Sequence, residues 1–419
     1  MKRLRYIHLI LYILFILPSV VFAQETLNWQ DCVKEAAKNN PNLIASQQAI
    51  KQSEAAKTIT ASTLFPQISS QASASTSKKE DTSDSYSYGA NGSQLVFDGF
   101  KTINNIKAAS ENINAAKQSY RFTSSEVRLN LRNAFINLLN SQELAKVAEE
   151  IVKIRRDDYE LITLRYESGL EHKGALLTSE ANLAQANLEL VQAKRDIEFA
   201  QRQLTQQLGR KEFKPMYVNG EFTVRDSARD KPDFEVIVKN NPSVLQAVAN
   251  KNAASYGIKS AYANFSPTLS GNVGANRSSE HWPPDENKWN TGLNVSMPIF
   301  EGGLRTAQVS QAKAIFTQSK ENERSTRDAA IVGLADTWAV LQNAIDTVSV
   351  RFKQLDATQV RSKIAEAQYS TGFISFDDWI IIENNLVTAK RAYLESQANA
   401  LYAEASWIQA KGEILEYAQ

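Results

Sequence analysis

Cysteine and histidine are nearly absent from this chain of 419 residues, which has one cysteine and three histidines. Cys32 alone cannot form an internal disulfide, and two separated histidines, His172 and His281, cannot complete a zinc site with it. Glycine (16 residues) and proline (10 residues) are also scarce. The chain contains no glycine-rich phosphate loop and no serine in a nucleophile-elbow pattern. These absences argue against an enzyme and predict neither cofactor nor metal.

The chain also lacks an excess of charge of one sign, with 47 Lys and Arg against 46 Asp and Glu. Lys2, Arg3 and Arg5 precede an apolar run, 7–21, which ends in small residues up to Ala23. This pattern is typical of a secretory signal peptide, 1–23, cleaved after Ala23, and the run is short for a retained membrane anchor. Cleavage would leave 44 of the 47 basic residues against 46 acidic ones, a net charge of −2. That balance gives no electrostatic footprint for nucleic acid.

What the chain does contain is a repeat. Asn39-Asn40-Pro41 recurs 201 residues later as Asn240-Asn241-Pro242. After a gain of two residues the offset becomes 203 and stays there. The later pairs are Phe97-Asp98-Gly99 with Phe300-Glu301-Gly302, Tyr166 with Tyr369, Gly169 with Gly372, and Gly209 with Gly412. A constant offset over most of the chain predicts two structurally similar halves.

Each half is predicted to contain a helix, a β-hairpin, a very long helix, a tight turn and another long helix. The first half is 24–209, with its β-hairpin at 66–98 and its helical hairpin at 99–209. The second is 231–419, with the corresponding parts at 267–301 and 302–416. Between them, 210–230 breaks the helical pattern, as either a short strand-bearing connection or a plain linker.

The strand segments are 67–77, 85–97, 268–277 and 289–300. The last gives the clearest signal, because Trp289, Thr291, Leu293, Val295 and Met297 alternate with polar residues and glycine. Each segment has about the ten residues that cross a bilayer as a tilted strand.

The longest helix follows from a second absence: 100–168 contains neither glycine nor proline. Within it, apolar residues recur at heptad-like spacing, namely Val127, Leu131, Ala134, Leu138, Ala145, Ala148 and Val152. At ~1.5 Å per residue, such a helix reaches about 100 Å. Two helical hairpins of this length must pack side by side as a rod or a wall.

Four strands cannot close a membrane barrel, and an open sheet edge in lipid leaves backbone groups unpaired at several kcal/mol each. The chain must therefore pool strands with copies of itself. Two copies give eight strands, a barrel filled by side chains, whereas three give twelve and leave room for a passage.

This order of parts resembles the TolC family of outer-membrane efflux proteins, over essentially the whole mature chain. The resemblance rests on the two Asn-Asn-Pro starts, on Pro66 and Pro267 before the hairpins, on the strand exits 96–99 and 298–302, and on the helix turns 165–170 and 369–373. It implies a homotrimer in the outer membrane that extends into the periplasm, with a twelve-stranded barrel continued by a tunnel of twelve helices. It also implies a passive exit duct for efflux or type I secretion that docks with a periplasmic adaptor and an inner-membrane transporter.

The resemblance places the two helix turns at the periplasmic tip, where an adaptor inserts. Gly169 and Gly372 are expected to adopt left-handed conformations that reverse the chain. The expected docking residues at these turns are Leu170, Leu177, Thr178, Ser179, Glu180 and Phe373.

An acidic group of Asp377, Asp378 and Glu383 follows the second turn. Its simplest interpretation is favourable charge at a helix N-terminus. The alternative, carried over from the family at Asp378, is a ring of three carboxylates that constricts the trimer's pore. Tyr369 matches a tip tyrosine of the family, but Ile374 stands where some members have arginine. Packing of Phe373, Ile374 and Phe376 is therefore an alternative to a salt-bridge latch.

Four aromatic residues lie in or beside the β-hairpins: Tyr86, Tyr88, Trp282 and Trp289. They are expected to anchor a barrel at the membrane interface. Two other classes of protein stay open. A secreted or periplasmic coiled-coil scaffold explains the helices but not the strands, and a trimeric outer-membrane adhesin would place the helices outside the cell.

Overall fold

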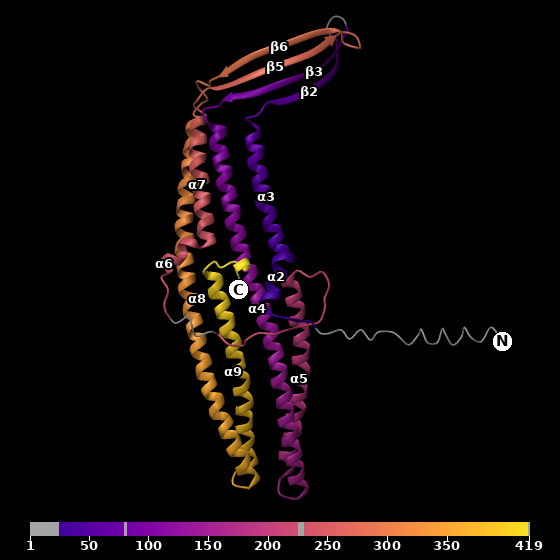
Figure 1. The fold of residues 1–419 in the computed structure, drawn as a ribbon, viewed down its shortest axis with the longest axis vertical. Coiled ribbons are helices and arrows are strands. Elements are labelled where there is room, and N and C mark those ends of the chain that lie inside the picture. The colour runs from indigo at the N-terminus through magenta and orange to yellow at the C-terminus, as the bar shows by residue number, and fades with distance from the viewer. Residues whose placement is uncertain (1–24, 79–81, 225–229, 418–419) are drawn as a thin grey trace, which may run out of the picture.

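The computed structural model describes residues 25–78, 82–224 and 230–417. A four-stranded sheet caps one end of a bundle of long helices, which run away from the sheet (Figure 1). The predicted signal peptide, 1–23, lies outside the described residues.

The first half contains α2 (Trp29–Asn39), α3 (Pro41–Ser62), β2 (Gln67–Lys78), β3 (Thr82–Phe97), α4 (Lys101–Glu167) and α5 (Lys173–Leu208). The second half contains α6 (Phe234–Ile237), a short 3-10 helix η1 (Val238–Asn240), α7 (Pro242–Ala263), β5 (Thr268–Ser279), β6 (Glu286–Ser296), α8 (Leu304–Ser370), α9 (Phe376–Ala410) and η2 (Leu415–Tyr417). The order of parts is the predicted one. Pro41 is the first residue of α3, and Cys32 is fully buried.

The sheet has the strand order β2-β3-β5-β6, with every neighbouring pair antiparallel. Its two edges, β2 and β6, pair with no further strand within the described residues. The predicted end of the last strand at residue 300 is wrong, since β6 stops at Ser296. Pro298 has no N–H to donate, which prevents the ladder from continuing there. At the other end, β6 starts three residues earlier than predicted.

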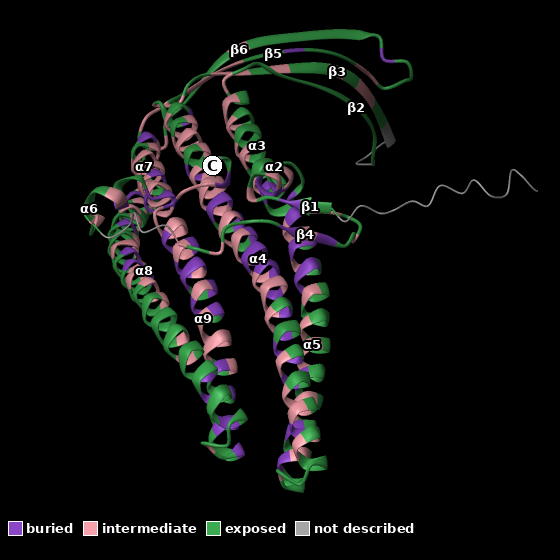
Figure 2. Cartoon of the chain, turned by 60° about the horizontal axis from the view of Figure 1, so that its bottom comes forward, coloured by how far each residue is buried: buried purple, intermediate pink, exposed green. Residues whose placement is uncertain are grey.

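The two faces of the sheet differ in chemistry. Ala90, Ala275 and Trp289 form one cross-strand row, so they share a face with Tyr86 and Tyr88. Further along, Val273, Leu293 and Val295 extend that apolar face. The opposite face carries the row Asn91–Gly274–Asn290 and further serines, asparagines and glycines. Both faces are largely exposed in the single chain (Figure 2).

Helices α4 and α8 are the 67-residue elements that run the length of the bundle. Near the sheet they pack with α3 and α7, and toward the far end they pack with α5 and α9 (Figure 1). All seven residues of the predicted seam on α4 are buried, which confirms the heptad-like pattern. The buried positions form stripes along α4 and α9 (Figure 2).

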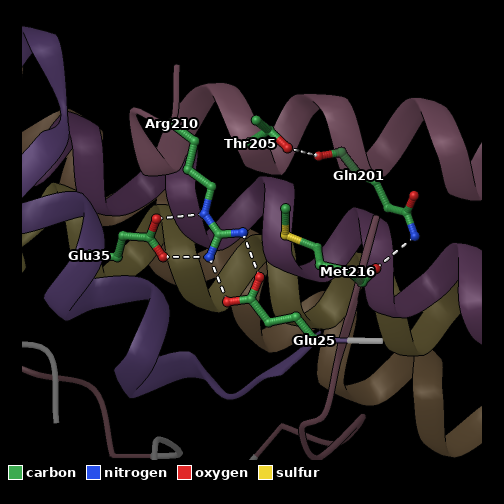
Figure 3. A network of polar contacts seen from close by, with 6 residues as sticks. All are labelled: Glu25, Glu35, Gln201, Thr205, Arg210 and Met216. Carbon is green, nitrogen blue, oxygen red and sulfur yellow. Dashed lines mark hydrogen bonds and ion pairs between the residues drawn. The ribbon is translucent and has the colours of Figure 1, made fainter. Parts of the chain in front are cut away.

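The connecting segment carries a strand, β4 (Met216–Val218), which pairs in parallel with β1 (Glu25–Leu27) near the start of the chain. Of the two interpretations left open for this segment, the strand-bearing connection is therefore correct. Gln142 of α4 brackets Val218, since its side-chain amide accepts from the Val218 N–H and donates to the Val218 carbonyl, at 2.9 Å each. Gln201 of α5 donates to the carbonyl of Met216 at 2.7 Å (Figure 3).

Candidate functional site

The two helix turns at the end far from the sheet have the same geometry. Gly169 has φ +73° and Gly372 has φ +78°, which confirms the predicted left-handed reversals. After each glycine, the next residue's N–H donates back to the last helical turn: Leu170 to Arg165 and Phe373 to Gln368, at 2.8 Å each. This is the pattern of a Schellman motif, which satisfies carbonyls that the helix end leaves free.

A small hydrophobic core joins the two turns. The Tyr369 ring stacks on the Trp379 ring at 4.6 Å between centroids, with an angle of 1° between the planes. Phe376 contacts both rings edge-on. The buried members of this tip core are Ile162, Ala175, Ala365, Tyr369, Phe376, Trp379 and Ile380, from α4, α5, α8 and α9. Ile374 packs against it, whereas the Phe373 side chain is 81% exposed. Of the three residues expected to pack at the constriction, two thus belong to this core.

Tyr369 also links the two helical hairpins through a hydrogen bond. Its hydroxyl donates to Glu171 Oε2 at 2.7 Å, and the Arg165 guanidinium lies 4.7 Å from the ring centroid. Burial and the bond to Glu171 raise the pKa of Tyr369 well above its usual value. The role of Glu171 could not be predicted from the sequence, because its partner Tyr369 lies 198 residues away. The only hint in the sequence is the position of Glu171, an acidic residue directly after Gly169 and Leu170.

The three acidic residues after the second turn do not share one surface. Asp377 and Asp378 are exposed, and the Asp378 carboxylate accepts from Ser375 Oγ at 2.7 Å at the start of α9. Glu383 is only 5% exposed and accepts from Ser362 Oγ at 2.5 Å. It lies five and six residues beyond them, about one and a half helical turns, which places it on the buried side of α9, facing α8. Glu383 is thus separated from the surface that the other two carboxylates share.

All but one of the residues expected to dock an adaptor are exposed at the turns. These exposed residues are Leu170, Leu177, Thr178, Glu180 and Phe373, and we call them the tip surface. Ser179 is buried and donates to the carbonyl of Leu176 at 2.8 Å, so it does not belong to this surface. The helical period turns it inward from its neighbours Thr178 and Glu180, which are exposed.

Aromatic residues gather at both ends of the sheet. At the end away from the helices, the Trp282 ring lies 6.2 Å from that of Tyr86 and 6.4 Å from that of Tyr88, and Trp289 stands exposed on the same face as the tyrosines. At the end next to the helices, an additional row of exposed phenylalanines was not predicted: Phe65, Phe97, Phe100, Phe265 and Phe300. Each lies at a strand exit or a helix end.

Across the described ranges, no three side chains of His, Cys, Asp or Glu gather closely enough to hold a metal ion. In the same parts of the chain, no helix combines the length and the apolar character needed to cross a membrane.

A model of the outer membrane efflux protein family matches the chain twice, over residues 32–210 and again over 235–413. The chain belongs to this family. The resemblance inferred from the sequence is confirmed, and so is the predicted location of the protein in the outer membrane.

Members of this family with similar sequences include the outer membrane efflux protein BepC of Brucella suis, 22% identical over 91% of this chain and 84% of BepC. The cation efflux system protein CusC of Escherichia coli K12 is 22% identical over 87% of this chain and 81% of its own. A solved structure of CusC superposes with a TM-score of 0.82 at 21% identity, covering 91% of each chain. This likeness confirms the predicted fold class, in which long helical hairpins are combined with the strands of a barrel.

Proposed function

We propose that this efflux family member is a passive exit duct, trimeric, that spans the outer membrane and the periplasm. The observation that carries the proposal is the incomplete sheet. It offers two free edges and an exposed apolar face on top of helices about 100 Å long. No part of this arrangement requires catalysis, and the proposal includes none.

Three copies complete the sheet. The edge strands β2 and β6 run in opposite directions, because they are the first and last of four antiparallel strands. When β6 of one copy meets β2 of the next, the antiparallel ladder therefore continues, and twelve strands close with no free edge. The strands of 11 to 16 residues are long enough to cross the hydrocarbon at a tilt. The aromatic residues at the two ends of the sheet would then lie at the two surfaces of the hydrocarbon layer.

The helices offer matching edges. Along the bundle, α8 is one lateral edge, and α3 with α5 is the other. Both edges carry exposed apolar side chains: Ile315, Val332, Val340, Val350, Phe352 and Val360 on α8, and Ile44, Ile59, Leu188, Val191 and Phe199 on α3 and α5. Packing of α8 against α3 and α5 of the next copy would bury these side chains and close a tunnel of twelve helices.

The tip surface would bind the periplasmic adaptor of an inner-membrane transporter, in a tripartite efflux or type I secretion system. Its apolar residues Leu170 and Phe373 stand at the two turns and remain uncovered in the chain. Asp377 and Asp378 lie beside them, and threefold symmetry would turn each into a ring that favours cations at the constriction. Glu383 is left out of this ring because it is buried.

The native mass of the mature chain, extracted in mild detergent from the outer-membrane fraction, tests the duct. A trimer is expected. A monomer, or a chain found only in the soluble fraction, would contradict the duct and favour the periplasmic scaffold. Protease treatment of intact cells separates the adhesin, since helices outside the cell would be cut while periplasmic helices would be protected. Conductance of the trimer in a planar bilayer then reports an open passage.

A further inference from the structure

A largely buried polar cluster lies between the two helical hairpins, one to two helical turns from the tip core. It joins α4 of the first hairpin to α8 and α9 of the second. Its members, which we call the junction cluster, are Arg155, Asp158, Ser362, Glu383 and Asn384. The side chains of Arg155 and Asp158 are 6% and 12% exposed, and Ser362 and Glu383 are buried, so these four residues are largely screened from water even in the single chain, whereas Asn384 lies exposed at the edge of the cluster.

The contacts of the junction cluster cross the boundary between the hairpins. Arg155 Nη1 lies 3.4 Å from Asp158 Oδ2 on the same helix, and Arg155 Nη2 donates to Asn384 Oδ1 of α9 at 2.5 Å. Next to Asn384, Glu383 accepts from Ser362 of α8. Arg155 therefore connects an acidic residue of one hairpin to the other hairpin, and the charge of Asp158 bears directly on that connection.

Negative charge exceeds positive charge around Asp158. The groups that act on it are Arg155 on its own helix, Glu383 of α9 and Glu366 of α8. The charge of one guanidinium is thus set against three carboxyl groups, of which Glu383 is buried, Asp158 is largely buried and Glu366 is exposed. Burial, opposed by Arg155 and aided by Glu383 and Glu366, raises the pKa of Asp158 to about 7. On α5, the carboxylate of Glu189 also interacts with the positive charge of Arg155, which contributes to lowering the pKa of Glu189.

We infer that the junction cluster is a proton-binding site at Asp158, and that proton binding holds the two helical hairpins together near the tip. When the hairpins are packed, a proton on Asp158 removes one of three competing negative charges and frees Arg155 for the second hairpin. When they separate, water reaches Asp158 and restores an ordinary carboxyl pKa of about 4. The inference rests on the proposed function only in that separation of the hairpins would widen the tip of a duct.

The direction of the pH dependence follows from the raised pKa of Asp158. A group that binds protons more tightly in the packed state favours that state as the pH falls. Between pH 7 and about pH 4, each unit of decrease should favour packed over separated hairpins by up to tenfold. Above pH 7, Asp158 is ionised in both states and the balance should no longer change. The tip is thus expected to loosen as the pH rises from 5 to 8.

The test is the distance between the two turns, measured by pulsed electron paramagnetic resonance on the full-length protein in detergent. Spin labels are attached at Leu170→Cys and Phe373→Cys, two exposed positions, with Cys32→Ala as background. In the otherwise unchanged chain, the population with long distances should grow as the pH rises, with a midpoint near 7. Asp158→Asn should keep short distances throughout. Asp157→Asn is the matched control, because its side chain is exposed one residue away, and it should leave the profile unchanged.

A pH-independent distance in the unchanged chain would overturn the inference, and so would a profile that persists in Asp158→Asn. If Asp158→Asn misfolds, Glu383→Gln provides a second test of the proton site. Loss of that neighbouring charge should move the midpoint to lower pH, and an unmoved midpoint counts against the site. The native mass of the same labelled sample reports the trimer separately. A trimer without pH dependence overturns the proton site alone, whereas a monomer overturns the duct.

Discussion

Asn40 and Asn241 make the same contact in the two halves of the chain. The Asn40 side chain donates to the carbonyl of Gln207 at 2.9 Å, and the Asn241 side chain donates to the carbonyl of Ala410 at 3.2 Å. Each also accepts from a backbone N–H two residues on, at 3.0 Å, and so caps the helix that follows it. Each asparagine thereby joins the end of one helix to the start of another.

Replacing Asn40 should loosen the first of these joints. Asn40→Ala removes the cap and the bond to Gln207 in a buried place, which should cost about 1–3 kcal/mol of unfolding free energy. The measurement is the denaturant midpoint of the protein in detergent. Asn42→Ala, at an exposed position two residues away, is the control and should change the midpoint little. Equal losses in the two variants would mean that the joint is not what stabilises this region.

The glycine that ends α5 should tolerate no side chain. Gly209 has φ +75°, and a Cβ placed there would lie 2.3 Å from the backbone oxygen of Asn39. Gly169 has a similar φ but nothing within 4 Å, so Gly169→Ala isolates the backbone strain of about 1–2 kcal/mol. Gly209→Ala adds a clash with backbone that cannot move aside cheaply, and should cost a further 1–3 kcal/mol or so. The difference between the two thermal midpoints measures the clash, and identical midpoints would disprove it.

These joints show what the sequence could and could not reveal. Asn-Asn-Pro and the terminal glycines stood out as repeated motifs, and the scarcity of glycine and proline predicted the long helices. That Gly209 touches Asn39, 170 residues away in the chain, was not visible, because one sequence holds no record of which distant residues meet. The same limit hid the pairs Tyr369–Glu171 and Arg155–Asn384. Within helices, periodicity predicted the seam on α4 but did not separate buried Ser179 and Glu383 from their exposed neighbours.

Tyr369→Phe should loosen the tip. It removes the hydroxyl that bonds to Glu171 across the hairpins while it keeps the ring stacked on Trp379. A hydrogen bond to a charged group contributes about 1.5–3 kcal/mol, so amides near both turns should exchange hydrogen roughly ten times faster or more. Tyr166→Phe is the control, since Tyr166 holds the corresponding place in the first half and is more exposed. If exchange rises equally in both variants, the bond to Glu171 does not hold the turns together.

Acid should release β1 from the connecting segment. Arg210 binds both Glu35, at 2.6 and 2.7 Å, and Glu25, at 2.8 Å twice, and so fixes β1 beside β4 (Figure 3). The hydrogen bonds from Arg210 lower the pKa of Glu25. Their stabilisation is therefore present above the ordinary glutamate pKa of about 4.3 and is lost as the pH falls through the lowered value.

Limited proteolysis with an acid-active protease should accordingly find the first strand protected at pH 5 and cut at pH 3. Arg210→Gln should be cut at both. Arg324→Gln, which removes an exposed pair with Glu321, should behave like the unchanged chain. Protection of the first strand in Arg210→Gln at pH 5 would show that β1 stays docked without the arginine.

The two faces of the sheet should respond in opposite ways to the same charge. Leu293 and Asn294 are neighbours on β6, so their side chains point to opposite faces. If the apolar face meets lipid, Leu293→Lys should cost about 2–4 kcal/mol per chain near the bilayer midplane and reduce the trimer recovered from the outer membrane. Asn294→Lys should assemble normally, because it faces the lumen, and its three positive charges should shift the trimer's reversal potential in a salt gradient toward anion selectivity. The opposite pattern, with Leu293→Lys inserted and Asn294→Lys lost, would place the serine and asparagine face against lipid and exclude a polar passage through the barrel.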